Sequence, residues 1–499
     1  MRMKWMRQAL LAVLPLCLAA QDLKEFEKNV TEFTLANGLH FIVLKRPQAP
    51  VVSMVTHVDV GSANDPAGMT GIAHMFEHMA FKGTDSFGTK NWPEEKKTLD
   101  EIEQIYDKLE VERNKGARAS QDVIKNLEAD LKAAITKANN FVEKEAYSKI
   151  ISENGGVGMN AGTGFDSTFY FYSLPANRIE LWFFLTSQVF KNPVMREFYT
   201  ERDVVRNERR MSFESSPQGK LQEALLTTAF IAHPQRSLIG WASDIENLRA
   251  KHAQEFYKKY YVPSNMVISI SGDVDPVEIK RMADQYFSGL AAGPNPPRVV
   301  TEEPAQTGER RVSVESPSQP ILYMGYKRPG PTSPDSPALA VLAGVLSQGR
   351  TGILYKEMVE QKKIALAAGA GPNFFGAKYP DIFIFFSAPS AGKTVEENEK
   401  AILEVIERMK KEKVEEAALK RIKTQVRAGL VRGLESNMGM AMQLASNHMR
   451  YGDWRKMFTN IQKVDEVTAE DLQRVAKTYL VDSARTVVYL KAPAKGEGK

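Results

Sequence analysis

The sequence predicts an α+β fold made of two similar domains, and three observations support this prediction. Alternating apolar residues on either side of Asn37-Gly38 predict a β-hairpin near the amino terminus. Strand and helix patterns then alternate in both halves of the chain. Residues 293–310, rich in Pro, Glu and Gly, are typical of a linker. We therefore expect a first domain over residues 21–292 and a second over residues 311–499.

The second half is predicted from its hydrophobic periodicity to repeat the pattern of the first. We expect strands over 311–317, 321–326, 381–386 and 486–491, and helices over 337–348, 396–411, 415–434 and 469–479.

Composition and charge exclude some classes of function. The chain has 499 residues, of which 43% are apolar, so it can bury large cores. Its Lys and Arg residues are interleaved with Asp and Glu and form no basic stripe, which argues against a nucleic-acid partner. No apolar run after residue 20 is long enough to cross a membrane.

Residues 1–20 are typical of a secretory signal peptide. Three basic residues precede an apolar run that ends at Ala20. Its removal would take the formal net charge from +5 to +2, because it carries those three positive charges and no acidic residue. We expect export, most simply to a bacterial periplasm; secretion, a lipid anchor at Cys17 or an uncleaved anchor are alternatives. Leu16 disfavours the lipid anchor, which needs a small residue before the only cysteine.

The strongest chemical signal is an H-x-x-E-H cluster in the apolar segment 71–84. This segment follows a predicted strand over 51–60 and favours a buried helix. Positions i and i+4 share a helix face, so His74 and His78 can meet one metal ion. Glu77 lies on the same face and can act as a base for water. The cluster predicts metal-assisted hydrolysis.

Residues 92–147 differ in character from the rest of the first half. They are highly charged, with an apolar residue at every third or fourth position and a turn signal at Gly116. We expect an inserted hairpin of two long antiparallel helices. A solvated spacer and a docking arm for a partner or substrate both fit this polar surface.

A Gly-rich segment over 154–164 precedes a predicted strand over 167–174. Its small side chains would let another backbone approach, as at the edge of a sheet that receives a substrate strand. Composition alone fits a flexible loop equally well. Farther on, Glu201 and Glu208 lie two helical turns apart on one face, an arrangement that is usually only solvated.

The run H-M-F-E-H-M-A-F-K-G-T closely resembles the motif of the pitrilysin/insulinase family, which includes the mitochondrial processing peptidases and bacterial processing-protease-like subunits. The segments N-A-x-T at 160–163 and E-R-x-x-V-x-x-E at 201–208 are also similar to this family, as is the stretch from His233 to Asp275. The resemblance covers nearly the whole mature chain. It implies two homologous α/β-sandwich domains that form one half of a metallopeptidase clamshell.

The resemblance also implies roles for individual residues. By it, His74, His78 and Glu208 bind one Zn²⁺ per chain, Glu77 is the catalytic base and Glu201 supports a zinc ligand. The same resemblance assigns the binding of a peptide substrate to three residues: Asn160, Ala161 and Thr163. The interval from His78 to Glu208 is longer than is usual in the family, and the inserted hairpin accounts for the excess.

One family feature is missing. Family members carry an Arg and a Tyr seven residues apart in a pattern like R-E-K-x-G-L-A-Y, whereas an ungapped match places Glu360 and Ala367 there. We therefore expect a zinc-dependent metalloendopeptidase that acts on peptides or unfolded segments as the metal-bearing subunit of a heterodimer. A second homologous subunit would supply the Arg/Tyr pair. The alternative is a non-catalytic peptide-binding or assembly subunit of the same fold.

Overall fold

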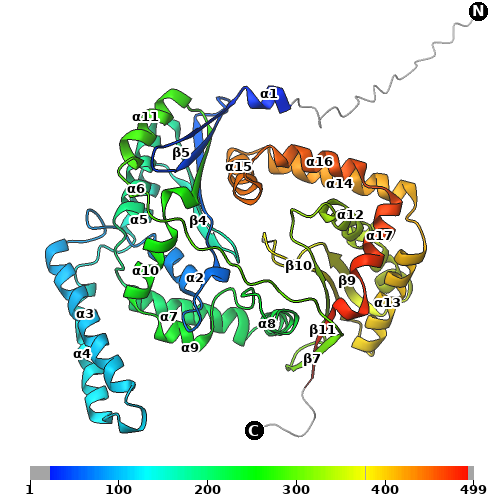
Figure 1. Ribbon diagram of the computed structural model, residues 1–499, viewed down its shortest axis with the longest axis horizontal. Coiled ribbons are helices and arrows are strands. Elements are labelled where there is room, and N and C mark those ends of the chain that lie inside the picture. Colours follow the sequence, from blue (N-terminus) through cyan, green and yellow to red (C-terminus); the bar gives the residue numbers. More distant parts are fainter. Residues whose placement is uncertain (1–22, 377, 493–499) are drawn as a thin grey trace, which may run out of the picture.

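The computed structural model describes residues 23–376 and 378–492, which form two mixed β-sheets, one in each half of the chain (Figure 1). The first sheet has the strand order β1-β2-β6-β3-β5-β4, with β2 and β6 parallel and the other pairs antiparallel. Its strands are β1 (Val30–Thr34), β2 (His40–Lys45), β3 (Val51–Val58), β4 (Val157–Thr163), β5 (Thr168–Pro175) and β6 (Met266–Gly272). The predicted hairpin is confirmed, and Gly38 forms its turn with φ of 95°.

The second sheet has the order β7-β11-β8-β10-β9, with one parallel pair, β7 and β11. Its strands are β7 (Arg310–Glu315), β8 (Leu322–Arg328), β9 (Ala365–Gly371), β10 (Asp381–Pro389) and β11 (Arg485–Lys491). The predicted α+β class, with one sheet in each half, is therefore confirmed.

Helices cover both sheets. Those of the first half are α1 (Leu23–Glu27), α2 (Ile72–Met79), α3 (Trp92–Arg113), α4 (Gln121–Asn139), α5 (Ala146–Glu153), α6 (Ile179–Lys191), α7 (Phe198–Arg209), α8 (Pro217–Ala229), α9 (Ala242–Asn247), α10 (Ala250–Tyr260) and α11 (Pro276–Phe287). Those of the second half are α12 (Ser336–Ser347), α13 (Val395–Lys411), α14 (Glu416–Gly433), α15 (Asn437–Tyr451), α16 (Lys456–Glu466) and α17 (Ala469–Tyr479). The sequence pattern predicts neither α15 and α16 nor the Ala- and Gly-rich strand β9.

The two halves exchange helices. Helix α15, from the second half, covers the face of the first sheet opposite α2, where Leu444 packs with Val55 and Val267. Helix α8, from the first half, covers the second sheet, where Leu225 packs with Val488. Because both faces of the first sheet are covered, its central strand β6 is buried throughout and β3 is buried from Val52 onward.

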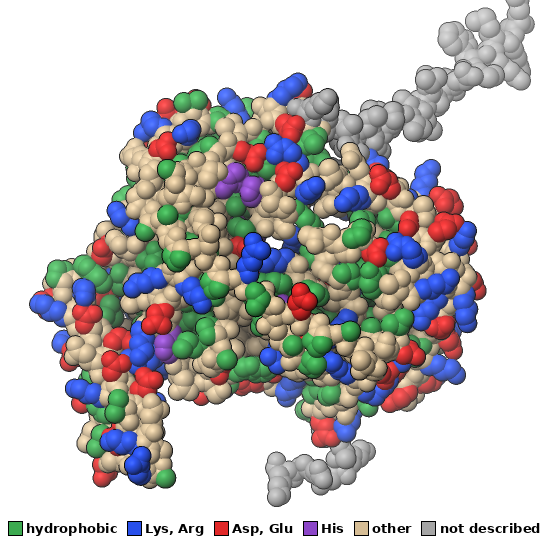
Figure 2. Space-filling view, in the orientation of Figure 1, with side chains coloured by type: hydrophobic (Ala, Val, Ile, Leu, Met, Phe, Trp, Pro, Cys, Tyr) green, Lys and Arg blue, Asp and Glu red, His purple; other side chains and the backbone are tan. Residues whose placement is uncertain are grey.

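The predicted helical insert is confirmed as an antiparallel hairpin of α3 and α4, with its turn at Gly116–Arg118. It projects from the body of the protein, and its visible surface carries mixed Lys, Arg, Asp and Glu side chains (Figures 1 and 2). The buried Arg249, at the N-cap of α10, holds the hairpin against the body by ion pairs with Glu103, Asp107 and Glu110 of α3.

No helix within residues 23–376 and 378–492 is long and apolar enough to cross a bilayer. The predicted signal peptide, residues 1–20 with Cys17, lies outside the described residues. Its cleavage and the expected export stay predictions.

Candidate active site

The H-x-x-E-H cluster lies on α2, whose start is held in place by a half-buried carboxylate. Asp65, in the loop before the helix, accepts hydrogen bonds from the backbone N–H groups of Gly71 (2.7 Å) and Ala73 (3.1 Å). Gly71 has a φ of 92°, and a Cβ there would lie 2.3 Å from the carbonyl oxygen of Ile239. Glycine is therefore required where the chain enters α2. Sequence reasoning missed Asp65, although an acidic residue before a helix is a known start signal.

The structure brings the three predicted metal ligands together. The rings of His74 and His78 lie 4.9 Å apart and nearly perpendicular, and Glu208 reaches them from α7. Oxygen Oε2 of Glu208 is 3.7 Å from Nε2 of each histidine. These distances are too long for hydrogen bonds. Ligands at about 2.1 Å from a tetrahedral zinc ion are about 3.4 Å apart, so the three atoms fit one divalent ion.

The pKa values of the two histidines shift in opposite directions. Burial lowers the pKa of His74 to about 3, helped by the charge on His78, so its ring is neutral at physiological pH. Burial also lowers the pKa of His78, but the hydrogen bond to Glu201 and the nearby carboxylates outweigh it, and the net shift is upward. A metal ion needs the neutral ring, so protons compete with it chiefly at His78.

Glu201 lies behind His78 and orients it. Its Oε2 is 3.2 Å from Nδ1 of His78, and its other oxygen pairs with Lys82. Burial raises the pKa of Glu201, but the hydrogen bonds to His78 and Lys82 outweigh it, so the carboxylate stays ionised. An Nδ1–H that donates to Glu201 leaves Nε2 free for a metal. Lys82 also pairs with Glu197 at 3.2 Å; sequence reasoning found neither residue.

Glu77 is held next to the three ligands by a residue from β4. Its Oε2 accepts a hydrogen bond of 2.6 Å from the hydroxyl of Thr163. Burial raises the pKa of Glu77, and the bond from Thr163 offsets part of the rise. A raised pKa makes this carboxylate a stronger base, which suits a general base.

The Gly-rich segment is strand β4, at the edge of the first sheet; the flexible-loop interpretation is wrong. Asn160 and Ala161 pair with β5 on one side, and Asn160 is exposed. The other side of β4 has no neighbouring strand in the sheet formed by the described residues. Thr163 points its hydroxyl at Glu77, a contact that the sequence did not predict. The peptide-binding role of the three residues stays a prediction.

A buried arginine ties the two ligand-bearing segments together. Arg196, just before α7, is 1% exposed and forms two bonds with Glu95 of α3, at 2.6 and 3.0 Å. It also donates to the carbonyl oxygens of Lys82 (2.6 Å) and Thr84 (2.9 Å), which follow α2. Sequence reasoning missed this clamp because nothing local distinguishes Glu95 from the other charges of the insert.

The backbone conformation near residue 363 suggests a different alignment with the family's R-E-K-x-G-L-A-Y pattern. The family pattern has Gly at its fifth position, which the ungapped match assigns to Ile364. The left-handed residue is Lys363, with φ of 52°, a conformation that favours glycine. A shift by one residue aligns these two positions and places Val359 and Leu366 in the Arg and Tyr positions instead of Glu360 and Ala367. In either match the pair is missing.

Two sheets with exchanged helices, and two histidines with two glutamates gathered at an edge strand, are features of a metallopeptidase half unit. Comparison with protein families identifies which one. Residues 41–112 and 132–240 match the family "Insulinase (Peptidase family M16)", and residues 247–426 match the "Peptidase M16 inactive domain". The chain belongs to the insulinase family, peptidase family M16, which confirms the resemblance. The gap within the first match, residues 113–131, covers the end of α3, the turn of the hairpin and the first part of α4.

Individual proteins agree with the family. The chain is 27% identical to "Zinc protease PqqE" of Helicobacter pylori over 98% of both chains. It is 22% identical to a probable mitochondrial-processing peptidase subunit beta of Arabidopsis thaliana, over 91% of this chain and 77% of that one. The crystal structure of a protease from Helicobacter pylori superimposes with a TM-score of 0.77 at 26% identity, covering 93% of this chain and 99% of that one.

Proposed function

We propose that this protein is a zinc-dependent metalloendopeptidase that hydrolyses peptides or unfolded segments. One observation carries the proposal: Nε2 of His74, Nε2 of His78 and Oε2 of Glu208 converge, with Glu77 held beside them. These three residues would hold one zinc ion at this centre. A bound zinc ion lowers the pKa of a water molecule and polarises a carbonyl group.

Several residues of the chain have separate roles in the proposed hydrolysis. Glu77 accepts a proton from the attacking water and delivers it to the leaving amine. Glu201 fixes the ring of His78, and Thr163 fixes the carboxylate of Glu77. An extended peptide pairs with the free edge of β4 near Asn160 and Ala161, where main-chain hydrogen bonds confer little sequence preference.

The active unit is a heterodimer in this proposal, and it works after export. The missing Arg/Tyr pair, which the family uses to orient the substrate and stabilise the oxyanion, comes from a second homologous subunit. The basic start and apolar run of residues 1–20 support export to a periplasm. The same missing pair supports the second candidate, a peptide-binding or assembly subunit without turnover.

A quenched-fluorescence peptide library separates these candidates. The zinc-loaded mature chain is assayed alone and with a homologous chain that has the Arg/Tyr pair but lacks H-x-x-E-H. We expect cleavage in the mixture. No cleavage by the chain alone or by the mixture would favour the non-catalytic candidate. The Glu77→Gln variant should keep zinc and lose hydrolysis by about 10²- to 10⁴-fold, and full activity in it would refute the mechanism. His74→Ala should lose zinc.

A further inference from the structure

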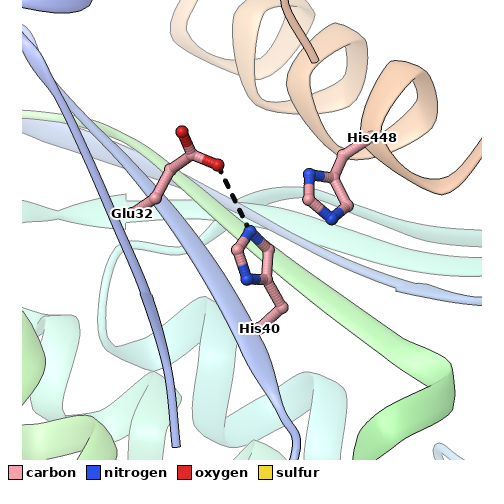
Figure 3. Close-up of side chains that lie close together, drawn as sticks. All are labelled: Glu32, His40 and His448. Carbon is pink, nitrogen blue, oxygen red and sulfur yellow. Dashed lines mark ion pairs between the residues drawn. The ribbon is translucent and has the colours of Figure 1, made fainter. Parts of the chain in front are cut away.

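A second group of metal-ligating side chains lies where α15 meets the first sheet. Glu32 on β1 and His40 on β2 project from the same face of the hairpin, because Thr34 pairs with His40 and Glu32 is two residues from Thr34. Helix α15 covers this face and adds His448. Figure 3 shows the carboxylate of Glu32 and the two imidazole rings around a common space.

Distances within this group suit a metal ion better than direct hydrogen bonds. Each residue offers a ligand atom, and the three atoms lie within 4.8 Å of one another. Oε2 of Glu32 is 3.5 Å from Nε2 of His40, too far for a good hydrogen bond. The rings of His40 and His448 are stacked, with 4.2 Å between their centroids and 20° between their planes. Because the lone pair of a ring nitrogen lies in the plane of its ring, the two stacked imidazoles must rotate about their side-chain bonds to reach one ion with the ligand spacing of about 3.4 Å that tetrahedral zinc requires.

Two buried nitrogen atoms here lack partners. Nε2 of His40 and Nδ1 of His448 are buried and form no hydrogen bond with any residue that the structure describes. Buried polar atoms without partners are rare and costly, and a metal ion is one of the groups that can satisfy them. The other nitrogen of His40, Nδ1, is 2.9 Å from the hydroxyl of Thr34. When Nδ1–H donates to Thr34, the lone pair of Nε2 faces Glu32, as in a metal-binding tautomer.

The surrounding charges orient the third ligand. Arg455 lies 2.9 Å from Oε1 of Glu32, which leaves Oε2 directed at the histidines. Glu27 and Asp453 also pair with Arg455, so its charge is balanced by more than Glu32. Burial lowers the pKa of both His40 and His448, which keeps both rings neutral, the form that binds a metal ion.

We propose that Glu32, His40 and His448 form a second zinc site, separate from the centre on α2. Two imidazoles and a carboxylate leave a fourth position for water, as in three-ligand zinc sites. Because His448 belongs to α15 and the other two residues belong to the first sheet, the ion would join a helix of the second half to strands of the first.

Metal counting tests this site without any assay of hydrolysis. The full mature chain is titrated with Co²⁺ as a spectroscopic substitute for zinc, with mass spectrometry to count the bound ions. We expect two ions per wild-type chain and one in His448→Gln. The control His252→Gln, which removes a histidine from α10, should keep two. One ion in wild type, or two in His448→Gln, would overturn the proposal.

Two further variants keep the test independent of the first site and of any folding defect. In a His74→Gln/His78→Gln chain, which lacks the α2 centre, one ion should remain, and added zinc should raise the thermal midpoint. This rise should vanish when His448→Gln is added. If His448→Gln does not fold by circular dichroism, His40→Gln replaces it. A midpoint that responds to zinc equally with and without the chosen histidine would overturn the proposal.

Discussion

Replacement of Glu201 tests whether the support of His78 determines zinc affinity. Glu201 and Glu197 both pair with Lys82, and both side chains are 14% exposed, but the contact at 3.2 Å with the ring of His78 belongs to Glu201. Glu201→Gln therefore removes the charge behind the ligand, whereas Glu197→Gln changes only the environment of Lys82. The two variants are matched in chemistry and burial; Glu201 lies in α7, and Glu197 is the residue that precedes this helix.

The expected loss of zinc affinity follows from the weaker contact between residue 201 and the ring of His78. A hydrogen bond to a charged group contributes about 1.5–3 kcal/mol, and loss of such support typically weakens metal binding by about 10- to 100-fold. The two ranges agree, since a tenfold change corresponds to about 1.4 kcal/mol. We expect Glu201→Gln to weaken zinc binding at pH 8 by about 10- to 100-fold and Glu197→Gln to leave it nearly unchanged.

The pH dependence distinguishes lost support from general damage. The net shift of the pKa of His78 is upward, so zinc affinity should fall as pH drops through that raised pKa. Glu201→Gln removes a cause of the rise, so its affinity should begin to fall at a lower pH. The ratio of wild-type to variant affinity should therefore be largest at pH 8 and smaller at pH 6.

Competition with a fluorescent chelator measures these affinities. The measurements are made in a His448→Gln background, so that the cluster of Glu32, His40 and His448 does not contribute. Equal weakening by Glu201→Gln and Glu197→Gln would refute the support of His78, since Lys82 would then explain both. An unchanged affinity in Glu201→Gln would refute it directly.

Three other perturbations follow from the contacts around the site. Thr163→Val should raise the pKa of Glu77 by removal of the donated hydrogen bond, which moves the acid limb of kcat/KM to higher pH; Thr163→Ser should not. Glu95→Gln leaves the charge of Arg196 buried and unpaired, so urea unfolding should show a loss of about 3–5 kcal/mol. The control Glu94→Gln, at an exposed residue, should leave the free energy of unfolding nearly unchanged. Replacement of residues 114–120, which connect α3 to α4, by a Gly-Ser turn of equal length should preserve zinc binding, and reduced peptide cleavage would favour the docking-arm interpretation.

The sequence predicted the elements whose structure is determined by residues close together in the chain. Asn37-Gly38 specifies its hairpin, and the spacing of His74, Glu77 and His78 places their side chains on one helix face without any long-range contact. Strand β9 was missed because its residues, ALAAGAG, include no β-branched or aromatic side chain. Helix α15 begins with the Met- and Gly-rich run NMGMAM. The weak hydrophobic periodicity of this run did not predict a helix that packs one face on the first sheet.

Contacts between distant segments could not be predicted. Glu95 and Arg196 are 101 residues apart, and nothing near either one marks it as a buried partner. His40 and His448 become neighbours only because α15 leaves its own half of the chain and packs on the first sheet. Helix exchange of this kind depends on the assembled fold, so the second histidine cluster was outside the reach of sequence reasoning.

Because of the same helix exchange, both halves of the chain affect the geometry of the proposed metal centre. Helix α7, which carries Glu208, continues through a π-helical turn (Arg210–Glu214) toward α8. Gly219 of α8 approaches that turn so closely that a Cβ would lie 1.9 Å from the carbonyl oxygen of Ser212. Helix α8 is in turn buried against the second sheet, whereas α2 packs within the first half. We therefore expect the position of Glu208 relative to the two histidines to depend on how the halves pack, which would couple the folding of the whole chain to the proposed zinc site.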